Sequence, residues 1–177
     1  MNLGIRMYGM GGQGIITLAK LVGEATLEDG KFVIMTEEYS PYITGGWSKA
    51  DLVISDETID YPLPEELNYL VTLSQEGFDT TVKELAPEST ILTEKSLVTV
   101  PQDMKLRSIE IGGIEISKSL KNPKGANIVL MGAFSGLTKI FSAESGRRAI
   151  TKRFPKYVDA NIACFERGYE EGVKYGR

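Results

Sequence analysis

The sequence contains no histidine and a single cysteine among its 177 residues. Without histidine, the chain cannot form a Ser-His-Asp or Cys-His catalytic group, a His-ligated metal site or a His general base. The single cysteine, Cys164, excludes an internal disulfide and any cysteine-clustered iron–sulfur or zinc site. We therefore predict no catalytic residue and no metal ligands in this chain. Any chemistry would use carboxylate, Lys, Tyr or Ser/Thr side chains, or a bound cofactor.

The sequence also lacks a long apolar run and a strong excess of charge. No stretch of 18 residues is uninterruptedly apolar, and Arg6 and several glycines interrupt the start, so neither a membrane span nor a signal peptide is predicted. The 20 Lys and Arg residues nearly balance the 24 Asp and Glu residues, for a net charge of −4, which does not suit a nucleic-acid binder. The unpaired Cys164 fits a reducing compartment. These features predict a cytosolic protein that binds neither nucleic acid nor membrane.

Length and hydrophobic content predict one domain over residues 1–177, because 42% hydrophobic residues suffice for a core of this size. Strand patterns alternate with helical patterns, which is typical of a three-layer αβα fold with a Rossmann-like, mostly parallel or mixed sheet. The alternation over 50–54 favours an antiparallel or edge strand, and Ser142 is the predicted N-cap of a helix. We expect strands near 3–8, 32–35, 50–54, 69–73, 90–92 and 107–111, a loop over 37–47, and helices near 15–29, 75–86 (stopped by Pro87), 114–120, 127–141, 143–154 and 157–174.

A glycine-rich motif follows the first expected strand and opens the first expected helix: Gly9-Met10-Gly11-Gly12-Gln13-Gly14. This context fits a dinucleotide fingerprint, in which glycines allow a tight turn and the helix start presents N–H groups to an anion. Glu37 or Glu38, at the end of the second strand, is then the candidate ribose ligand. The same motif also fits a turn that only permits close strand–helix packing. The amide of Gln13 is a further candidate to face a ligand or a partner.

A second motif occupies the expected loop from Glu38 to Lys49, which holds three aromatic residues and the sequence Thr44-Gly45-Gly46. In a doubly wound fold, this loop lies at the carboxyl edge of the sheet, beside the first glycine motif. Exposed aromatics in a loop indicate a surface that faces a ligand or a subunit. An ordinary packed loop is the alternative interpretation.

Two asparagines and the cysteine lie in the helical C-terminal third. Asn127 and Asn161 stand on otherwise apolar helix faces, where an amide usually caps or braces a neighbouring group, so structural roles are predicted. Cys164 is predicted to be a small buried hydrophobic residue. Arg167, one turn away, is a weak candidate for activating its thiol.

With these motifs in place, the chain resembles the gamma subunits of 2-oxoacid:ferredoxin oxidoreductases over nearly its whole length. The resemblance rests on Gly9–Gly14 and on Tyr39-Ser40-Pro41 leading to Gly45-Gly46-x-Ser48-x-Ala50. It also rests on Val53-Ile54-Ser55-Asp56, on Asn127-x-x-x-x-Gly132 and on Asn161-x-x-x-Phe165-x-x-Gly168.

The resemblance implies a subunit that is inactive alone, in a complex that oxidatively decarboxylates a 2-oxoacid, forms an acyl-coenzyme A and reduces ferredoxin. Thiamine diphosphate and iron–sulfur clusters would be held by the partners, a thiamine-binding chain and a ferredoxin-like chain. The implied cofactor-contact residues, which would approach the coenzyme A phosphates, are Gly9, Gly11, Gly12, Gln13, Gly14, Thr44, Gly45 and Gly46.

Two positions depart from patterns common in that family. Thr44 stands where many members carry Arg, and Val53 stands where many pyruvate-type members carry Arg. The Val-Ile-Ser-Asp sequence resembles the 2-oxoglutarate-type chains more closely. Two alternatives remain open at this point: a stand-alone NAD- or FAD-binding domain, and an architectural subunit without ligand contact.

Overall fold

The structure is a computed structural model that describes residues 2–41 and 45–176. Strands alternate with helices in the first two thirds of the chain, and helices alone form the last third. The strands are β1 (Asn2–Met10), β2 (Phe32–Tyr39), β3 (Trp47–Ser55), β4 (Leu67–Thr72), β5 (Leu85–Glu94) and β6 (Arg107–Ile111). The helices are α1 (Ile15–Glu28), α2 (Gln75–Thr81), the short 3-10 helix η1 (Val82–Glu84), α3 (Gly113–Ser119), α4 (Ala126–Thr138), α5 (Ala143–Arg153) and α6 (Val158–Val173).

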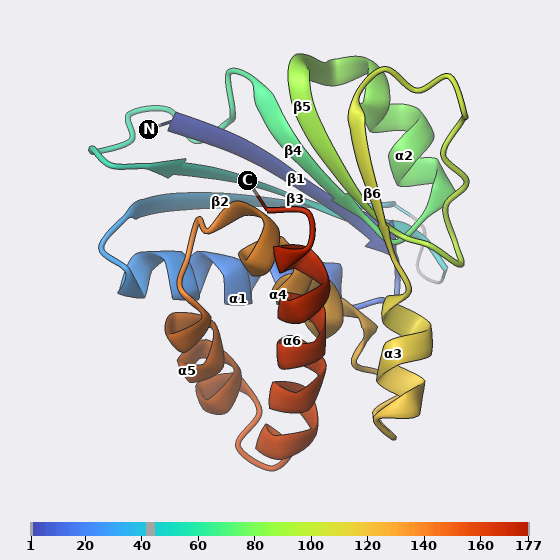
Figure 1. Ribbon diagram of the computed structural model, residues 1–177. Coiled ribbons are helices and arrows are strands. Elements are labelled where there is room, and N and C mark those ends of the chain that lie inside the picture. The colour runs from blue at the N-terminus through green and yellow to red at the C-terminus, as the bar shows by residue number, and fades with distance from the viewer. Residues whose placement is uncertain (1, 42–44, 177) are drawn as a thin grey trace.

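The six strands form one mixed sheet in the order β2-β3-β1-β4-β5-β6. Helices α1 and α3–α6 gather on one side of it and α2 lies on the other, which confirms the predicted three-layer αβα fold (Figure 1). β1 is central, parallel to β4 and antiparallel to β3. The ends of β1 and β4 therefore meet at one edge of the sheet, where the glycine motif follows β1.

β3 pairs antiparallel with both of its neighbours, as one of the two sequence interpretations predicted. The other interpretation, an edge strand, is wrong, because β2 forms the edge and β3 lies inside the sheet. Ala50, Leu52 and Ile54 are fully buried in the main core, while Asp51 and Val53 are nearly buried on the opposite face. Burial on both faces is the physical signature of an interior strand.

The main core lies between the sheet and the helices on the side of α1. Ile5 and Met7 of β1 pack there with Leu18 and Val22 of α1, all without solvent exposure. A smaller cluster under α2 joins Leu70, Phe78, Ile91 and Val98 on the opposite side. The two clusters anchor the central strands from both faces, so that β1 and β4 hold the glycine motif on a rigid base.

Several predicted element boundaries are wrong, in two regions above all. β2 continues to Tyr39 and β3 begins at Trp47, so the connecting loop is shorter than the predicted 37–47. Ion pairs between Lys20 and Glu37 and between Lys49 and Glu38, both at 2.9 Å, support the extended strand ends. The helix predicted over 75–86 ends at Thr81, and Pro87 lies inside β5, where the register with β4 shifts. A proline is tolerated in a strand at such an irregularity, because no ladder hydrogen bond is required there.

The C-terminal helices follow the sequence prediction closely. Ser142 caps α5 as predicted, since its Oγ accepts a hydrogen bond from the Ser145 N–H at 3.1 Å. α4 ends at Thr138, short of the predicted Phe141. Within the described residues, no helix combines the length and apolarity that a membrane crossing requires.

α4 and α6 pack backbone against backbone. A Cβ atom added at Gly168 would lie 1.9 Å from the carbonyl oxygen of Val129, and one at Gly132 would lie 2.0 Å from that of Phe165. Gly172 and Gly136 meet the opposite helix in the same way, at 2.1 Å from the Ala133 oxygen and 2.4 Å from the Tyr169 oxygen. The helices can approach this closely only because no side chain stands between them.

Candidate functional site

The glycine loop, residues 9–14, connects β1 to α1 at the edge of the sheet where the parallel strands end. Gly12 and Gly14 adopt left-handed backbone conformations, with φ of 88° and 74°. A Cβ atom at Gly14 would also lie 2.5 Å from the amide nitrogen of Asn127, so both conformation and space require glycine there. The loop therefore turns sharply into α1 and leaves the first amides of the helix uncovered by side chains.

Two amide side chains brace this loop from inside the protein. The Gln13 Oε1 accepts a hydrogen bond from the Met10 N–H at 2.7 Å, and its Nε2 donates to the Leu73 carbonyl at 2.9 Å. The Asn127 Nδ2 donates to the Gly14 carbonyl at 3.1 Å. Asn127 thus has the bracing role that the sequence predicted. Gln13, considered as a ligand-facing group, instead turns its amide inward and joins the end of β1 to the end of β4.

The described residues of the second loop, 40–41 and 45–46, lie against the glycine loop. The Gly11 N–H donates to the Gly46 carbonyl at 2.7 Å, and the Ser40 N–H donates to the Trp47 carbonyl at 2.9 Å. Trp47 stacks on Tyr8 of β1 with ring centroids 5.6 Å apart. These contacts place the two glycine motifs side by side, as predicted from the sheet edge that they share.

The described residues of the two loops line an open cavity of about 480 Å³. Five of the predicted residues line it: Gly11, Gly12, Gly14, Gly45 and Gly46. Gly9 and Gln13 are not in its lining, and Thr44 lies outside the described residues. The remaining lining comes from the start of α1 and from the ends of β2 and β3: Ile15, Ile16, Thr17, Tyr39, Ser40, Trp47 and Ser48.

The start of α1 gives this cavity its electrostatic character. Gly14 is the N-cap and supplies no side-chain cap, and the first turn holds no acidic residue. The amides of Ile15, Ile16 and Thr17 belong to the first turn, where no carbonyl of the helix can accept from them. The helix dipole adds partial positive charge at this end. Among the described residues that line the cavity there is no Lys or Arg, so its attraction for an anion rests on backbone N–H groups.

Tyr8 supports the cavity indirectly, because its ring stacks on Trp47, which belongs to the lining. Burial, followed by the charge and hydrogen bonding of Glu76, raises the pKa of Tyr8 to about 12. The Tyr8 hydroxyl donates to the Glu76 carboxylate at 3.3 Å. Tyr8 therefore stays a neutral hydrogen-bond donor throughout the physiological range. The sequence analysis missed this residue, although an aromatic side chain near the end of β1 was the available signal.

The arrangement around Glu37 does not favour the dinucleotide-binding alternative. In a dinucleotide fold, the acidic residue follows a strand directly beside β1, whereas here β3 separates β2 from β1. A hydrogen bond from Tyr39, followed by one from Lys20, lowers the pKa of Glu37, and that carboxylate is already engaged by both groups. Glu38 is paired with Lys49.

The cysteine and the second asparagine have structural environments. Cys164 is fully buried, and burial raises the pKa of its thiol, while Arg167 pairs with Glu170 at 2.6 Å instead of approaching the sulfur. Asn161 accepts a hydrogen bond from Asn122 at 3.0 Å and donates to the Tyr157 carbonyl. Over residues 2–41 and 45–176, no cluster of three or more His, Cys, Asp or Glu side chains could hold a metal ion.

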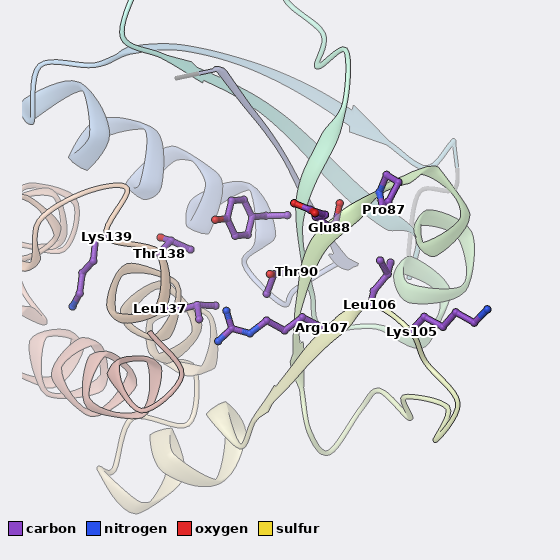
Figure 2. Close-up of a pocket in the computed structure, with 11 residues that line it drawn as sticks. Pro87, Glu88, Thr90, Lys105, Leu106, Arg107, Leu137, Thr138 and Lys139 are labelled. Atoms are coloured by element: carbon purple, nitrogen blue, oxygen red, sulfur yellow. The ribbon is translucent and has the colours of Figure 1, made fainter. Parts of the chain in front are cut away.

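A second cavity, of about 520 Å³, lies at the opposite end of the sheet, between the starts of β5 and β6 and the end of α4. Figure 2 shows Arg107 extending toward Leu137, while Lys105 points away from both. Arg107 donates to the Tyr175 carbonyl, and Lys139 donates to the Tyr169 hydroxyl at 2.6 Å. Two of its three cations thus already serve contacts within the chain, and the loop cavity is the stronger site candidate.

Known proteins are similar to this chain in sequence and in fold. Residues 4–171 match the family described as pyruvate ferredoxin/flavodoxin oxidoreductase. A 2-oxoglutarate synthase subunit KorC from Methanocaldococcus jannaschii is 38% identical over 176 residues, which cover 96% of this chain and 94% of that protein. A ketoisovalerate oxidoreductase subunit VorA from Methanothermobacter thermautotrophicus is 28% identical, and the match covers 94% of this chain but only 35% of that protein.

A crystal structure with the same fold comes from Geobacter sulfurreducens. It is the gamma subunit of a keto/oxoacid ferredoxin oxidoreductase, 29% identical, and it superposes with a TM-score of 0.88 over 100% of this chain and 99% of that one. The likeness therefore extends over the whole described fold.

Proposed function

Since this chain belongs to the pyruvate ferredoxin/flavodoxin oxidoreductase family, we propose that it serves as the gamma subunit of a complex that converts 2-oxoglutarate and coenzyme A to an acyl-coenzyme A. The electrons released by the decarboxylation pass to ferredoxin. The observation that carries the choice of substrate is the 38% identity, over 96% of the chain, to a 2-oxoglutarate synthase subunit. The Val53-Ile54-Ser55-Asp56 sequence supports the same substrate, because it resembles chains of the 2-oxoglutarate type.

The donor set of this chain does not fit an iron–sulfur cluster. Clusters are held by several cysteine thiolates, and the one cysteine here is fully buried. We assign the clusters and thiamine diphosphate to partner subunits, a ferredoxin-like chain and a thiamine-binding chain. Thiamine diphosphate supplies the electron sink for decarboxylation when it is bound. A single, buried cysteine fits a reducing compartment, and we place the complex in the cytosol.

The cavity between the two loops fits the phosphates of coenzyme A. The first-turn amides of Ile15, Ile16 and Thr17 would donate to phosphate oxygens, and Gly11 and Gly12 would let the ligand approach the backbone. Gly45 and Gly46 form the opposite wall. This chain would then bind and orient the thioester-forming substrate, while the reaction itself proceeds on groups held by its partners.

Reconstitution of the complex tests the substrate assignment. We expect coenzyme A-dependent reduction of an acceptor with 2-oxoglutarate, weaker reduction with pyruvate or 2-oxoisovalerate, and none when this chain is omitted. Full turnover without this chain, or a preference for pyruvate, would refute the assignment.

Substitution of Thr17 tests the phosphate site. A glutamate in the first turn of a helix stabilises the helix, yet here it would also place a negative charge in the cavity. We expect Thr17→Glu to raise the KM for coenzyme A by about tenfold, with unchanged or increased thermal stability. Thr17→Gln is the control of equal size without the charge and should change the KM little. An unchanged KM in Thr17→Glu would favour the architectural subunit, which makes no ligand contact.

A further inference from the structure

One half of the sheet has a face without a helix. α1 covers one side of β1, β3 and β2, whereas on the other side α2 lies toward β4 and β1, and no described helix lies over β3 and β2 (Figure 1). Alternation along the strands places Ile34 and Val53, which are paired in register, side by side on this second face. Phe32, on the same face of β2, is 45% exposed. Val53 itself is only 4% exposed, so the accessible apolar part of this half of the sheet lies at its edge, at Phe32.

The segment 56–66 lies along this face between β3 and β4. It contains no helix or strand, and Pro62 and Pro64 restrict its backbone. Two of its apolar side chains face solvent, with Tyr61 61% exposed and Leu63 41% exposed. A stiff segment that presents large apolar side chains loses little conformational entropy when another surface covers it.

Two hollows open beside Leu63, between the segment and the sheet. One, of about 220 Å³, is lined by Val53, Ile59 and Tyr61 among others, and the second, of about 260 Å³, by carboxylates. Leu63 and Glu65 belong to the lining of both. In the second hollow the charged side chains are Arg6, Glu38, Asp51, Glu65 and Glu84, one cation against four carboxylates. Arg6 is bonded to Asp51 and Glu84 at 2.8 and 2.6 Å, and Lys49 is paired with Glu38 at 2.9 Å. Two cations thus face the four carboxylates, and the excess charge is still negative.

The charge of the segment identifies the kind of surface that would cover this face. Residues 56–66 contain five acidic residues (Asp56, Glu57, Asp60, Glu65 and Glu66) and no basic one, hence −5. The whole chain carries −4, so the remainder carries −4 − (−5) = +1. Like-charge repulsion disfavours nucleic acid, an anionic lipid surface and the same face of a second copy.

We propose that the segment 56–66 and the adjoining face of β2 and β3 form a docking surface for another protein subunit of the complex. The contacting surface of that subunit has an apolar centre surrounded by Lys or Arg side chains. Leu63 and Tyr61 are the apolar anchors, and a basic side chain of the partner enters the carboxylate-lined hollow. This inference rests on the proposed function only in requiring a partner subunit. In the relative VorA, the matched region is only 35% of the chain, so it is joined there to further protein. This supports a protein as the occupant of the surface.

The test measures binding of this chain to the remaining subunits encoded with it, purified together as a subassembly. We expect Asp60→Lys/Glu65→Lys and Leu63→Ser each to raise the dissociation constant at least about tenfold, while the wild-type affinity falls as salt rises. The matched controls are Asp103→Lys/Glu110→Lys, exposed carboxylates elsewhere with the same change of charge, and Leu27→Ser on α1. Both controls should bind within about twofold of the wild type. Because the mutated side chains are exposed, unchanged thermal unfolding of each variant establishes that the fold is intact.

Three results would overturn the proposal. The first is that the segment variants bind as tightly as the wild type, and the second is that the control charge reversal weakens binding equally. The third is that the isolated chain forms a dimer in sedimentation experiments and that Leu63→Ser abolishes this dimer. Turnover of 2-oxoglutarate by the wild-type complex is measured separately. A complex that assembles through this surface but oxidises another substrate contradicts the proposed function and leaves the docking surface standing.

Discussion

Replacing Gly168 with alanine probes the backbone contact between α4 and α6. In an exposed helix this change normally stabilises by about 1 kcal/mol, because alanine is the better helix former. Here the added Cβ would lie 1.9 Å from the Val129 oxygen and 3.0 Å from the Ala133 nitrogen. Both neighbours are backbone atoms that cannot rotate away, so the helices must separate by roughly 1.5 Å to restore an ordinary contact of about 3.5 Å.

The separation sets the expected magnitude. Overpacking of a filled core costs about 1–3 kcal/mol or more, and moving α6 also loosens the neighbouring contacts at Gly132 and Gly172. We expect a net loss of about 2 kcal/mol in the free energy of unfolding, opposite in sign to the helix propensity. For a chain of this length, that corresponds to a fall in Tm of about 4–8 °C.

Urea unfolding, followed by circular dichroism, measures the effect. Gly23→Ala in α1 is the matched control, because its Cβ would meet only side-chain atoms of Val33 and Leu52 at 3.6 and 3.7 Å. This variant should unfold at the same or a slightly higher urea concentration than the wild type. A Gly168→Ala protein as stable as the wild type, or a Gly23→Ala protein equally weakened, would refute the packing argument.

Three further predictions concern buried or bonded side chains. Gln13→Leu removes both hydrogen bonds that join the ends of β1 and β4, and should cost about 2–4 kcal/mol in urea unfolding, because two backbone groups lose their partners. Partial burial alone would raise the pKa of Asp29, but hydrogen bonds from Ser145 and Ser142 lower it below its usual value. A lowered carboxyl pKa contributes stability above the pKa of the unfolded chain, and this stability is lost as the pH falls through the lowered pKa. In thermal melts, Asp29→Asn should therefore be less stable than the wild type near pH 7, and the difference should shrink as the pH is lowered into the acid range. Cys164 is fully buried with a raised thiol pKa, so a thiol reagent should label it only after unfolding.

Each of these predictions has a result that contradicts it. A Gln13→Leu protein that unfolds at the same urea concentration as the wild type argues against the two-bond account. A difference between Asp29→Asn and the wild type that does not change with pH excludes the carboxylate as its source. Rapid labelling of native Cys164 contradicts its burial.

Local sequence signals predicted most of the fold, because helices such as α1, α5 and α6 are specified by apolar periodicity and a cap such as Ser142. The interior position of β3 was not predictable in this way. It depends on pairing with β1 across about 45 residues, as in Arg6↔Asp51, and alternation alone cannot distinguish a half-buried edge from an interior strand. The start of β5 was not predicted for a related reason. Pro87 was interpreted as the stop of a helix, whereas it lies at a register shift between two strands.

The residues of the candidate site also differ in whether local sequence could predict them. The glycines were identifiable because a strand, a glycine turn and a helix follow one another in the chain. The inward orientation of Gln13 depends on Leu73, which is 60 residues away, and no local pattern contains that information. The stacking of Trp47 on Tyr8 likewise arises only once β1 and β3 pair.

The glycine contacts between α4 and α6 also have a mechanical consequence. Because no side chains that could rearrange lie between α4 and α6 at these contacts, we expect the two helices to move together as one rigid unit. The first turn of α4 also holds the glycine loop, since Asn127 donates a hydrogen bond to the Gly14 carbonyl. A contact that displaces α6 from its exposed side would therefore also displace the start of α1, because side-chain rearrangement between the helices takes up little of the movement. The glycine loop, which we assign to phosphate binding, is thus mechanically coupled to the solvent-exposed side of α6.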